Sequence, residues 1–311
     1  MKTLDHNGMS LLDADVLARI HRLELVARGV VEGFVSGRHR SPYRGFSVEF
    51  AEHREYTPGD DIRDLDWRVY GKTDRYFVKQ YMEETNLRCT LLLDASGSMR
   101  YTGEAAAQYR GRRLSKFEYA RLMAANLAHL LIYQQDAVGL VTLDRRIRRY
   151  WPASSRSGYL KTILDEMAAT EPADETALAP VFHEIAERIR RRGLVIVFSD
   201  LFDDAAAILG ALHHFRFRKH EIIVFHIMAE EELTFPFDRW TLFRDMENSE
   251  RRLELDPQAI RATYLDHVRA FLREIEKGCG RMKIDYVPVS TKRPFDDALV
   301  SYLAHRRFLV K

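Results

Sequence analysis

Several features that mark common protein classes are missing from this sequence of 311 residues. It has only two cysteines, Cys89 and Cys279, which lie far apart and outside any C-x-x-C motif. This usage argues against a disulfide scaffold or a zinc ribbon and favours a reducing compartment. No apolar run approaches the roughly 18 residues of a membrane span, and the N-terminus lacks the apolar core of a signal peptide. We therefore expect a cytoplasmic protein without a membrane span.

The sequence also has no strong excess of positive or of negative charge. The net charge is +2, from 48 basic and 46 acidic residues, so no global field would recruit nucleic acid. A phosphate-binding G-x-x-x-x-G-K-[ST] loop does not occur, so the chain is not itself a P-loop ATPase. The sequence "FHEIAER" (182–188) begins like an H-E-x-x-H zinc motif, but its last position is occupied by Glu187. We expect neither nucleic-acid binding nor zinc-protease chemistry.

From residue 88 onward, the sequence contains short and nearly continuous apolar runs. They lie at 88–96, 136–144, 194–200, 221–228 and 282–290. Brief runs rich in β-branched residues are typical of strands that are buried on both faces. Because longer helical patterns separate them, the sequence predicts an α/β fold with a doubly wound, mostly parallel sheet.

Two helical segments between these strands carry end signals. Ser115 and Glu118 have the spacing of a capping box at the start of a helix, and an apolar stripe follows them. The sequence "ERIRRRG" (187–193) predicts a helix that ends at a glycine cap, Gly193.

The first 87 residues have a different pattern. Residues 11–34 predict an amphipathic helix, and residues 41–84 predict strands and tight turns, among them the turn "TPGD" at 57–60. We expect region 1–87 to form a smaller helix-and-strand part packed on a sheet domain of residues 88–311. Within that domain, segment 230–256 predicts an inserted hairpin ahead of the next helix.

The run "LLLDASGSM" (91–99) ends in an acid and two hydroxyls, Asp94, Ser96 and Ser98. Ligands of open α/β sheets bind beyond the carboxyl ends of the strands. Asp200 ends another apolar strand in the same way, and Thr176 stands where a helix begins. These oxygen-bearing side chains from separate loops could converge on a small hard cation.

This pattern resembles the metal-ion-dependent adhesion site of the von Willebrand factor A family. That site has D-x-S-x-S in a first loop, Thr in a second and Asp in a third, and the matching residues are Asp94, Ser96, Ser98, Thr176 and Asp200. The resemblance implies a von Willebrand A-like fold and a divalent cation, Mg²⁺ or Mn²⁺, held by these five side chains. It also implies that an acidic side chain of a client protein completes the coordination.

The stretch from residue 43 to residue 100 resembles the bacterial domain-of-unknown-function family 58. Residues that match in order include Arg54, Tyr56, Asp66, Trp67 and Lys79. Proteins of this family are commonly encoded beside MoxR-type AAA+ ATPases, so the resemblance implies such an ATPase as a partner. Segment 100–113 is an insertion next to the predicted metal site.

Two classes of function remain open from the sequence. The first is a non-enzymatic, metal-dependent protein-interaction module that acts as an adaptor of the ATPase. The second is a Mg²⁺-dependent phosphotransferase or phosphatase with Asp94 as its nucleophile. Such enzymes normally carry a second acid two residues later, where this chain has Ser96. We therefore favour the interaction module.

Overall fold

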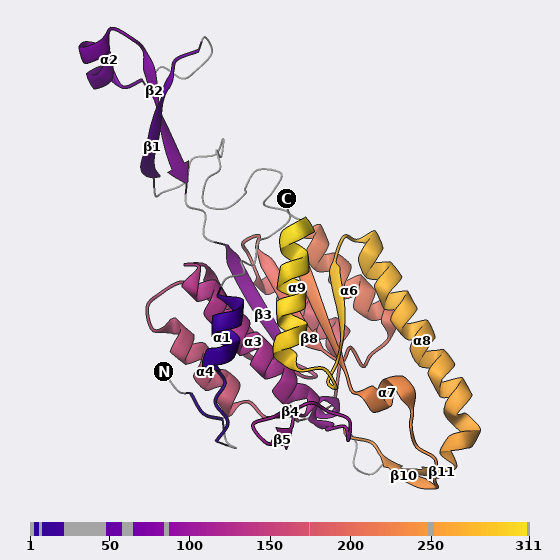
Figure 1. Cartoon of the computed structure of the whole chain (residues 1–311). Coiled ribbons are helices and arrows are strands. Elements are labelled where there is room, and N and C mark those ends of the chain that lie inside the picture. The colour runs from indigo at the N-terminus through magenta and orange to yellow at the C-terminus, as the bar shows by residue number, and fades with distance from the viewer. Residues whose placement is uncertain are drawn as a thin grey trace. The chain divides into compact units, whose positions relative to one another are not determined.

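The computed structural model describes residues 3–5, 8–21, 48–57, 65–83, 87–173, 175–247 and 252–309, which fall into two compact units (Figure 1). The larger unit contains the described residues up to residue 21 and from residue 87 onward. The smaller unit contains those between residues 48 and 83. Among the described residues, no helix is both long enough and apolar enough to serve as a membrane span.

A sheet of six strands forms the centre of the larger unit. In their order across the sheet, the strands are β12 (Asp285–Ser290), β9 (Glu221–Met228), β8 (Leu194–Ser199), β3 (Arg88–Asp94), β6 (Ala137–Leu143) and β7 (Ile147–Ser154). All neighbours pair in parallel except β6 and β7, which pair antiparallel. The prediction of a mostly parallel sheet is confirmed, and the five predicted apolar runs supply its parallel strands.

The central strands are mostly apolar and are buried at nearly every position because both of their faces are covered. Along β3, Leu91 and Leu93 belong to one hydrophobic core, whereas Leu92 between them belongs to the other. Successive side chains of a strand point to opposite faces, so a strand between two helical layers needs no polar position. Side chains that point to either face are therefore apolar, which explains the continuous apolar runs in the sequence.

Helices cover both faces of the sheet, as a doubly wound fold requires (Figure 1). The helices whose residues join the first core are α1 (Ala14–Ile20), α3 (Lys116–Tyr133), α4 (Tyr159–Ala169) and α9 (Phe295–Leu309). Those that join the second core are α5 (Leu178–Arg188), α6 (Ala205–Phe217) and α8 (Pro257–Arg281).

The predicted capping box at the start of α3 is present. The Glu118 N–H donates to the Ser115 hydroxyl (3.2 Å), and the Glu118 carboxylate accepts from the Ser115 N–H (3.0 Å). The helix itself is buried almost all round, well beyond the predicted stripe, because it contacts α1, α4, α9 and the sheet. Its first residue, Lys116, is only 1% exposed.

Helix α1 begins at an Asp13 cap and buries Val16 and Ile20 in the first core. It therefore lies in the larger unit, which differs from the expected division at residue 87. The rest of the predicted helix, from residue 22 to residue 34, lies outside the described residues.

The smaller unit consists of a strand pair and one short helix. Strands β1 (Val48–Glu55) and β2 (Phe77–Glu83) pair antiparallel, and α2 (Trp67–Thr73) precedes β2. The helix was not predicted, although Asp66 caps it by accepting from two backbone N–H groups. Most of the predicted turn at 57–60 lies outside the described residues, and the packing of this unit on the sheet stays a prediction.

The connection from α5 to β8 corrects one prediction. Helix α5 ends at Arg188 with Ile189 as its C-cap, so Gly193 does not cap it. Gly193 instead lies against the backbone of Arg88, where a Cβ atom would collide with the Arg88 carbonyl oxygen. The glycine is therefore required by the close approach of two neighbouring chain segments rather than by a helix end.

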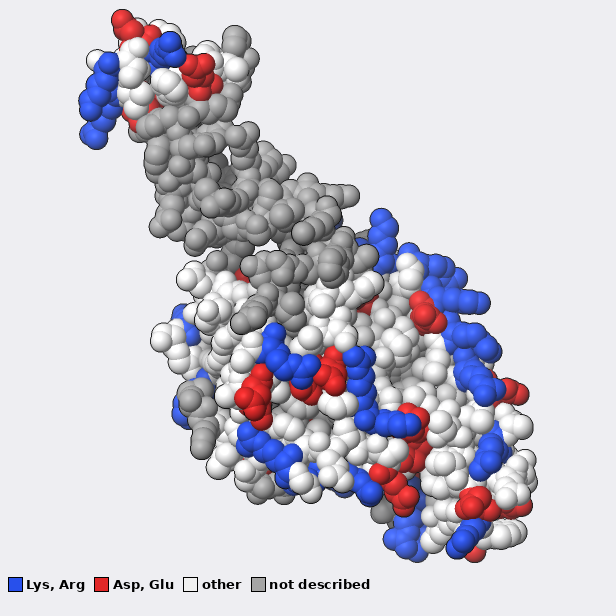
Figure 2. All heavy atoms as spheres, viewed as in Figure 1, with Lys and Arg blue, Asp and Glu red and all other residues white. Residues whose placement is uncertain are grey.

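The two predicted insertions contain small elements of their own. Segment 230–256 contains the short helix α7 (Glu230–Thr234) and an antiparallel pair, β10 (Thr241–Arg244) with β11 (Arg252–Leu255). Segment 100–113 follows the 3₁₀ turn η3 (Gly97–Arg100) and contains the pair β4 (Gln108–Tyr109) and β5 (Arg112–Arg113). Basic and acidic side chains are interspersed over the face of the larger unit seen in Figure 2.

Candidate functional site

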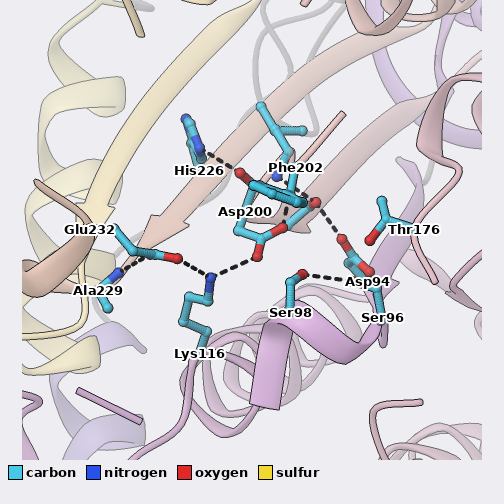
Figure 3. A network of polar contacts seen from close by, with 12 residues as sticks. Asp94, Ser96, Ser98, Lys116, Thr176, Asp200, Phe202, His226, Ala229 and Glu232 are labelled. Carbon is cyan, nitrogen blue, oxygen red and sulfur yellow. Dashed lines mark hydrogen bonds and ion pairs between the residues drawn. The ribbon is translucent and has the colours of Figure 1, made fainter. Parts of the chain in front are cut away.

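The carboxyl ends of two neighbouring strands bring the two predicted acids together. Asp94 is the last residue of β3, and Asp200 directly follows β8, its parallel neighbour in the sheet (Figure 3). Both side chains are buried, with exposures of 1% and 7%. Parallel pairing thus places two carboxylates in one buried cluster at this edge of the sheet.

The Asp94 carboxylate accepts hydrogen bonds from neutral donors. The Ser96 N–H lies 2.9 Å from Oδ1, and the Ser199 hydroxyl lies 2.5 Å from Oδ2. Burial, followed by repulsion from Asp200, raises the pKa of Asp94 to about 7, although these hydrogen bonds partly oppose the shift. The ionised form of Asp94 is therefore disfavoured relative to the protonated form unless a cation lies near it.

The Asp200 carboxylate has a cationic partner in Lys116. The Lys116 Nζ lies 2.7 Å from Asp200 Oδ2 and 2.6 Å from Glu232 Oε1 in α7. Burial alone would raise the pKa of Asp200, but the ammonium group lowers it below the usual value. In turn, the two carboxylates outweigh the burial of Lys116 and raise its pKa.

Sequence reasoning missed Lys116. One signal was available, because a lysine at the first position of a helix interacts unfavourably with the helix dipole and gains from a nearby carboxylate. Ser199 and Glu232 were missed as well, since their contacts join segments far apart in the chain.

The two serines of the D-x-S-x-S loop lie beside each other. Their hydroxyl oxygens are 3.2 Å apart, with Ser96 fully buried and Ser98 half-buried at the start of η3. The structure thus brings four of the five predicted residues, Asp94, Ser96, Ser98 and Asp200, into one cluster (Figure 3).

The fifth predicted residue, Thr176, has a different partner. Its N–H lies 3.0 Å from Glu247 Oε2, and its hydroxyl donates to Glu247 Oε1. In Figure 3 the Thr176 hydroxyl faces the loop of Asp94 and Ser96. Thr176 therefore lies next to the cluster while it holds a carboxylate that comes from the segment after β10.

A buried histidine hydrogen-bonds the backbone of the loop that carries Asp200. His226 in β9 has its Nε2 2.8 Å from the Asp200 carbonyl oxygen and its Nδ1 2.7 Å from the Tyr286 hydroxyl. Burial lowers the pKa of His226 to about 4, so the ring is neutral near pH 7. His226 orients the backbone of the loop and adds no charge to the cluster.

The donor chemistry of this cluster fits a hard divalent cation. Among the described residues no group of three or more His, Cys, Asp or Glu side chains forms a metal site, so a cation here would need the serine and threonine hydroxyls as well. Carboxylate and hydroxyl oxygens suit Mg²⁺ or Mn²⁺. When Asp94 is ionised, the cluster contains three carboxylates, of Asp94, Asp200 and Glu232, against one ammonium group, so a divalent cation would balance its charge.

Two solved structures are similar to this chain at low identity and low TM-score. A conserved hypothetical protein BatB from Bacteroides thetaiotaomicron is 15% identical, with 71% of this chain and 100% of that chain covered, at a TM-score of 0.44. An aerotolerance-related membrane protein from Bacteroides fragilis is 15% identical with the same coverage, at a TM-score of 0.46. At these scores neither likeness carries a conclusion about this chain.

Comparison with protein sequences is more informative. The uncharacterized protein Rv1480 of Mycobacterium tuberculosis and the uncharacterized protein Mb1516 of Mycobacterium bovis are each 24% identical over 307 residues. These matches cover 95% of this chain and 91% of each relative. The model of the family "Protein of unknown function DUF58" matches residues 52–273, which is well over half of the chain. The chain therefore belongs to the DUF58 family.

Proposed function

We propose that this protein is a non-enzymatic, metal-dependent protein-interaction module. In this proposal Asp94, Ser96, Ser98, Thr176 and Asp200 hold Mg²⁺ or Mn²⁺, and the site binds an acidic side chain of a partner protein. The observation that carries the proposal is the contact between Thr176 and Glu247.

Glu247 is a carboxylate from another part of the chain that already sits at the candidate site. Its two oxygens accept from the N–H and the hydroxyl of Thr176, so the contact is bidentate. A bidentate contact fixes the orientation of a carboxylate as well as its position. The acidic side chain of a partner would make the same contact, with Glu247 as an internal competitor.

The residues of the cluster have separate roles in this proposal. Asp94 has no cationic partner among the residues that the structure describes, and it supplies the negative charge that attracts the cation. Ser96 and Ser98 supply neutral oxygens, and Lys116 keeps Asp200 ionised. When bound, the cation would supply a positive charge and a coordination position for an incoming carboxylate.

The proposed partner is a MoxR-type AAA+ ATPase, for which the protein would act as an adaptor to a client protein. This part of the proposal rests on the resemblance to the family in the sequence 43–100. A cytoplasmic location belongs to the same proposal.

The alternative reaction, phosphoryl transfer through Asp94, has less support. A nucleophilic carboxylate must reach the substrate, but Asp94 is 1% exposed and both of its oxygens accept hydrogen bonds. The position of the second acid is occupied by Ser96, which cannot serve as a general acid at neutral pH.

A binding measurement with a MoxR-type AAA+ ATPase tests the proposal. We expect the wild-type chain to bind in Mg²⁺ and to lose binding in EDTA, in at least one nucleotide state of the ATPase. The variant Ser98→Ala should weaken binding in Mg²⁺, whereas the exposed control Ser301→Ala should not. Equal binding in Mg²⁺ and EDTA would contradict a metal-dependent interaction, and turnover of a generic phosphatase substrate by wild type would favour the enzyme.

A further inference from the structure

A cavity lies at the opposite end of the sheet from the Asp94 cluster. It has a volume of about 220 Å³ and is bordered by the first residues of β3 and β8, the end of β7 and the connection that follows α5. Because β7 runs antiparallel to its neighbour, its last residues meet the first residues of the parallel strands. The cavity is thus built by rigid strand ends and one short connection.

The charged residues that line this cavity are all basic. Arg88 begins β3, and Arg190 and Arg191 belong to the connection between α5 and β8; none of the described lining residues is acidic. Within the described residues, no ion pair joins any of these three arginines to a carboxylate. By contrast, Arg188 pairs with Glu184 at 2.5 Å on the preceding helix.

Arg88 is oriented by the cavity wall, since its Nη2 donates to the Ala153 carbonyl oxygen at 2.8 Å. A guanidinium has five N–H donors, so this bond leaves most of them available. Like charges that converge on one cavity repel each other, and a bound anion relieves that repulsion. Arginine forks match the oxygens of a phosphate group particularly well.

A buried histidine also lines the cavity. His220 is 1% exposed, and its side chain hydrogen-bonds the backbone of Gly193 and Ile189, which line the same cavity. Burial lowers the pKa of His220, so the ring is neutral near pH 7 and does not add to the charge of the arginines.

We propose that this cavity binds a phosphate group, either free inorganic phosphate or the phosphate of a small monoester. Its volume is below the 300–1,000 Å³ or so of pockets for drug-sized ligands, which favours a small phosphate ligand over a dinucleotide. The half-buried Tyr150 and the neighbouring Pro152 give the wall an apolar side for the carbon part of a monoester. This site is independent of the metal-dependent function proposed above.

Titration calorimetry of the full-length chain in EDTA tests this proposal. We expect one saturable site for inorganic phosphate, compared with chloride at the same ionic strength. Glycerol phosphate serves as the second probe: tighter binding than inorganic phosphate would identify a monoester as the ligand, and equal or weaker binding would identify free phosphate. No saturable binding of either probe would overturn the proposal.

Variants of one short segment distinguish this cavity from any other anion site. Arg190→Ala and Arg191→Ala should each weaken phosphate binding about tenfold, since each removes charged hydrogen-bond donors. Arg192→Ala removes the same charge from the next position, which does not line the cavity, and should change the affinity less than twofold. Equal losses in all three variants, or no loss in any, would overturn the assignment. Thermal unfolding without phosphate checks that each variant is folded.

Discussion

The buried ammonium group of Lys116 lies 2.7 Å from the Asp200 carboxylate, so one of the two acids expected to hold a metal already has a cation beside it. A divalent cation at the candidate site therefore competes with Lys116 for Asp200. The same ammonium group contacts Glu232 in α7, which joins the site to the inserted segment 230–256.

We predict that Lys116→Met lowers stability in EDTA and strengthens Mg²⁺ binding. The variant leaves two carboxylates without their partner, and breaking a buried ion pair in this way costs about 3–5 kcal/mol. It also removes the competitor for Asp200, so Mg²⁺ should recover part of the loss. Thermal unfolding in EDTA and in Mg²⁺ measures both effects, with the exposed Lys161→Met as the control. A smaller Mg²⁺ effect than in wild type would contradict the competition.

Replacement of Asp94 should separate metal binding from folding. Asp94→Asn keeps the size of the side chain and removes a buried charge next to Asp200, so stability in EDTA near pH 7 should stay equal or rise. The increment that Mg²⁺ adds to wild type, about 2.7 kcal/mol at a hundredfold excess over Kd, should vanish. Calorimetric titration with Mg²⁺ and thermal unfolding measure the two quantities. Unchanged Mg²⁺ binding by this variant would exclude Asp94 as a ligand.

The internal acid Glu247 should compete with external acids. Glu247→Ala frees the N–H and the hydroxyl of Thr176, so a fluorescent glutamate-rich peptide should bind about tenfold more tightly in Mg²⁺. Fluorescence anisotropy measures the affinity, and Glu254→Ala on exposed β11 is the matched control. Weaker peptide binding by Glu247→Ala would mean that Glu247 helps to form the site.

A carboxylate outside the site should make stability depend on pH. Asp136 is half-buried and accepts from the Leu87 N–H at 2.9 Å, and burial raises its pKa from 3.8 to about 7. The folded state therefore holds its proton more tightly than the unfolded state does. The stabilisation from this proton is full below pH 3.8 and is lost as the pH rises towards 7.

The variant Asp136→Asn tests this dependence. Each unit of pKa difference corresponds to about 1.4 kcal/mol, so the variant should remove a measurable part of the decline in stability between pH 4 and pH 7. Urea unfolding at a series of pH values gives the free energies. A variant with the wild-type slope would show that Asp136 has an ordinary pKa.

Two glycines should respond oppositely to alanine. Gly193→Ala places a methyl group against the Arg88 carbonyl oxygen and should lower stability by about 1–3 kcal/mol. Gly210→Ala lies within α6 with no atom near the new methyl group, so it should raise stability by up to about 1 kcal/mol. Urea unfolding measures both changes, and equal stability of the two variants would contradict the packing at Gly193.

Local patterns in the sequence predicted those features that depend on neighbouring residues. Continuous apolar runs identified the five parallel strands because a strand between two helical layers is buried at nearly every position, as in β3, β6, β8 and β9, although the edge strand β12 is only partly buried. Ser115 and Glu118 identified the start of α3 because a capping box involves residues only three positions apart. The ends of β3 and β8 similarly indicated where Asp94 and Asp200 would lie.

Tertiary structure alone decided which side chains are partners at the candidate site. Lys116 meets Asp200 across 84 positions of the chain, and Thr176 meets Glu247 across 71. The order of the strands and the position of the inserted segment determine these contacts, and neither leaves a periodic pattern in the sequence. An ion pair between distant segments forms only after packing has brought both groups together, and burial then adds a desolvation cost that the pairing must offset. The sequence by itself therefore determined the sheet and the loops that carry the acids, whereas tertiary packing determined which charged side chains lie next to those acids.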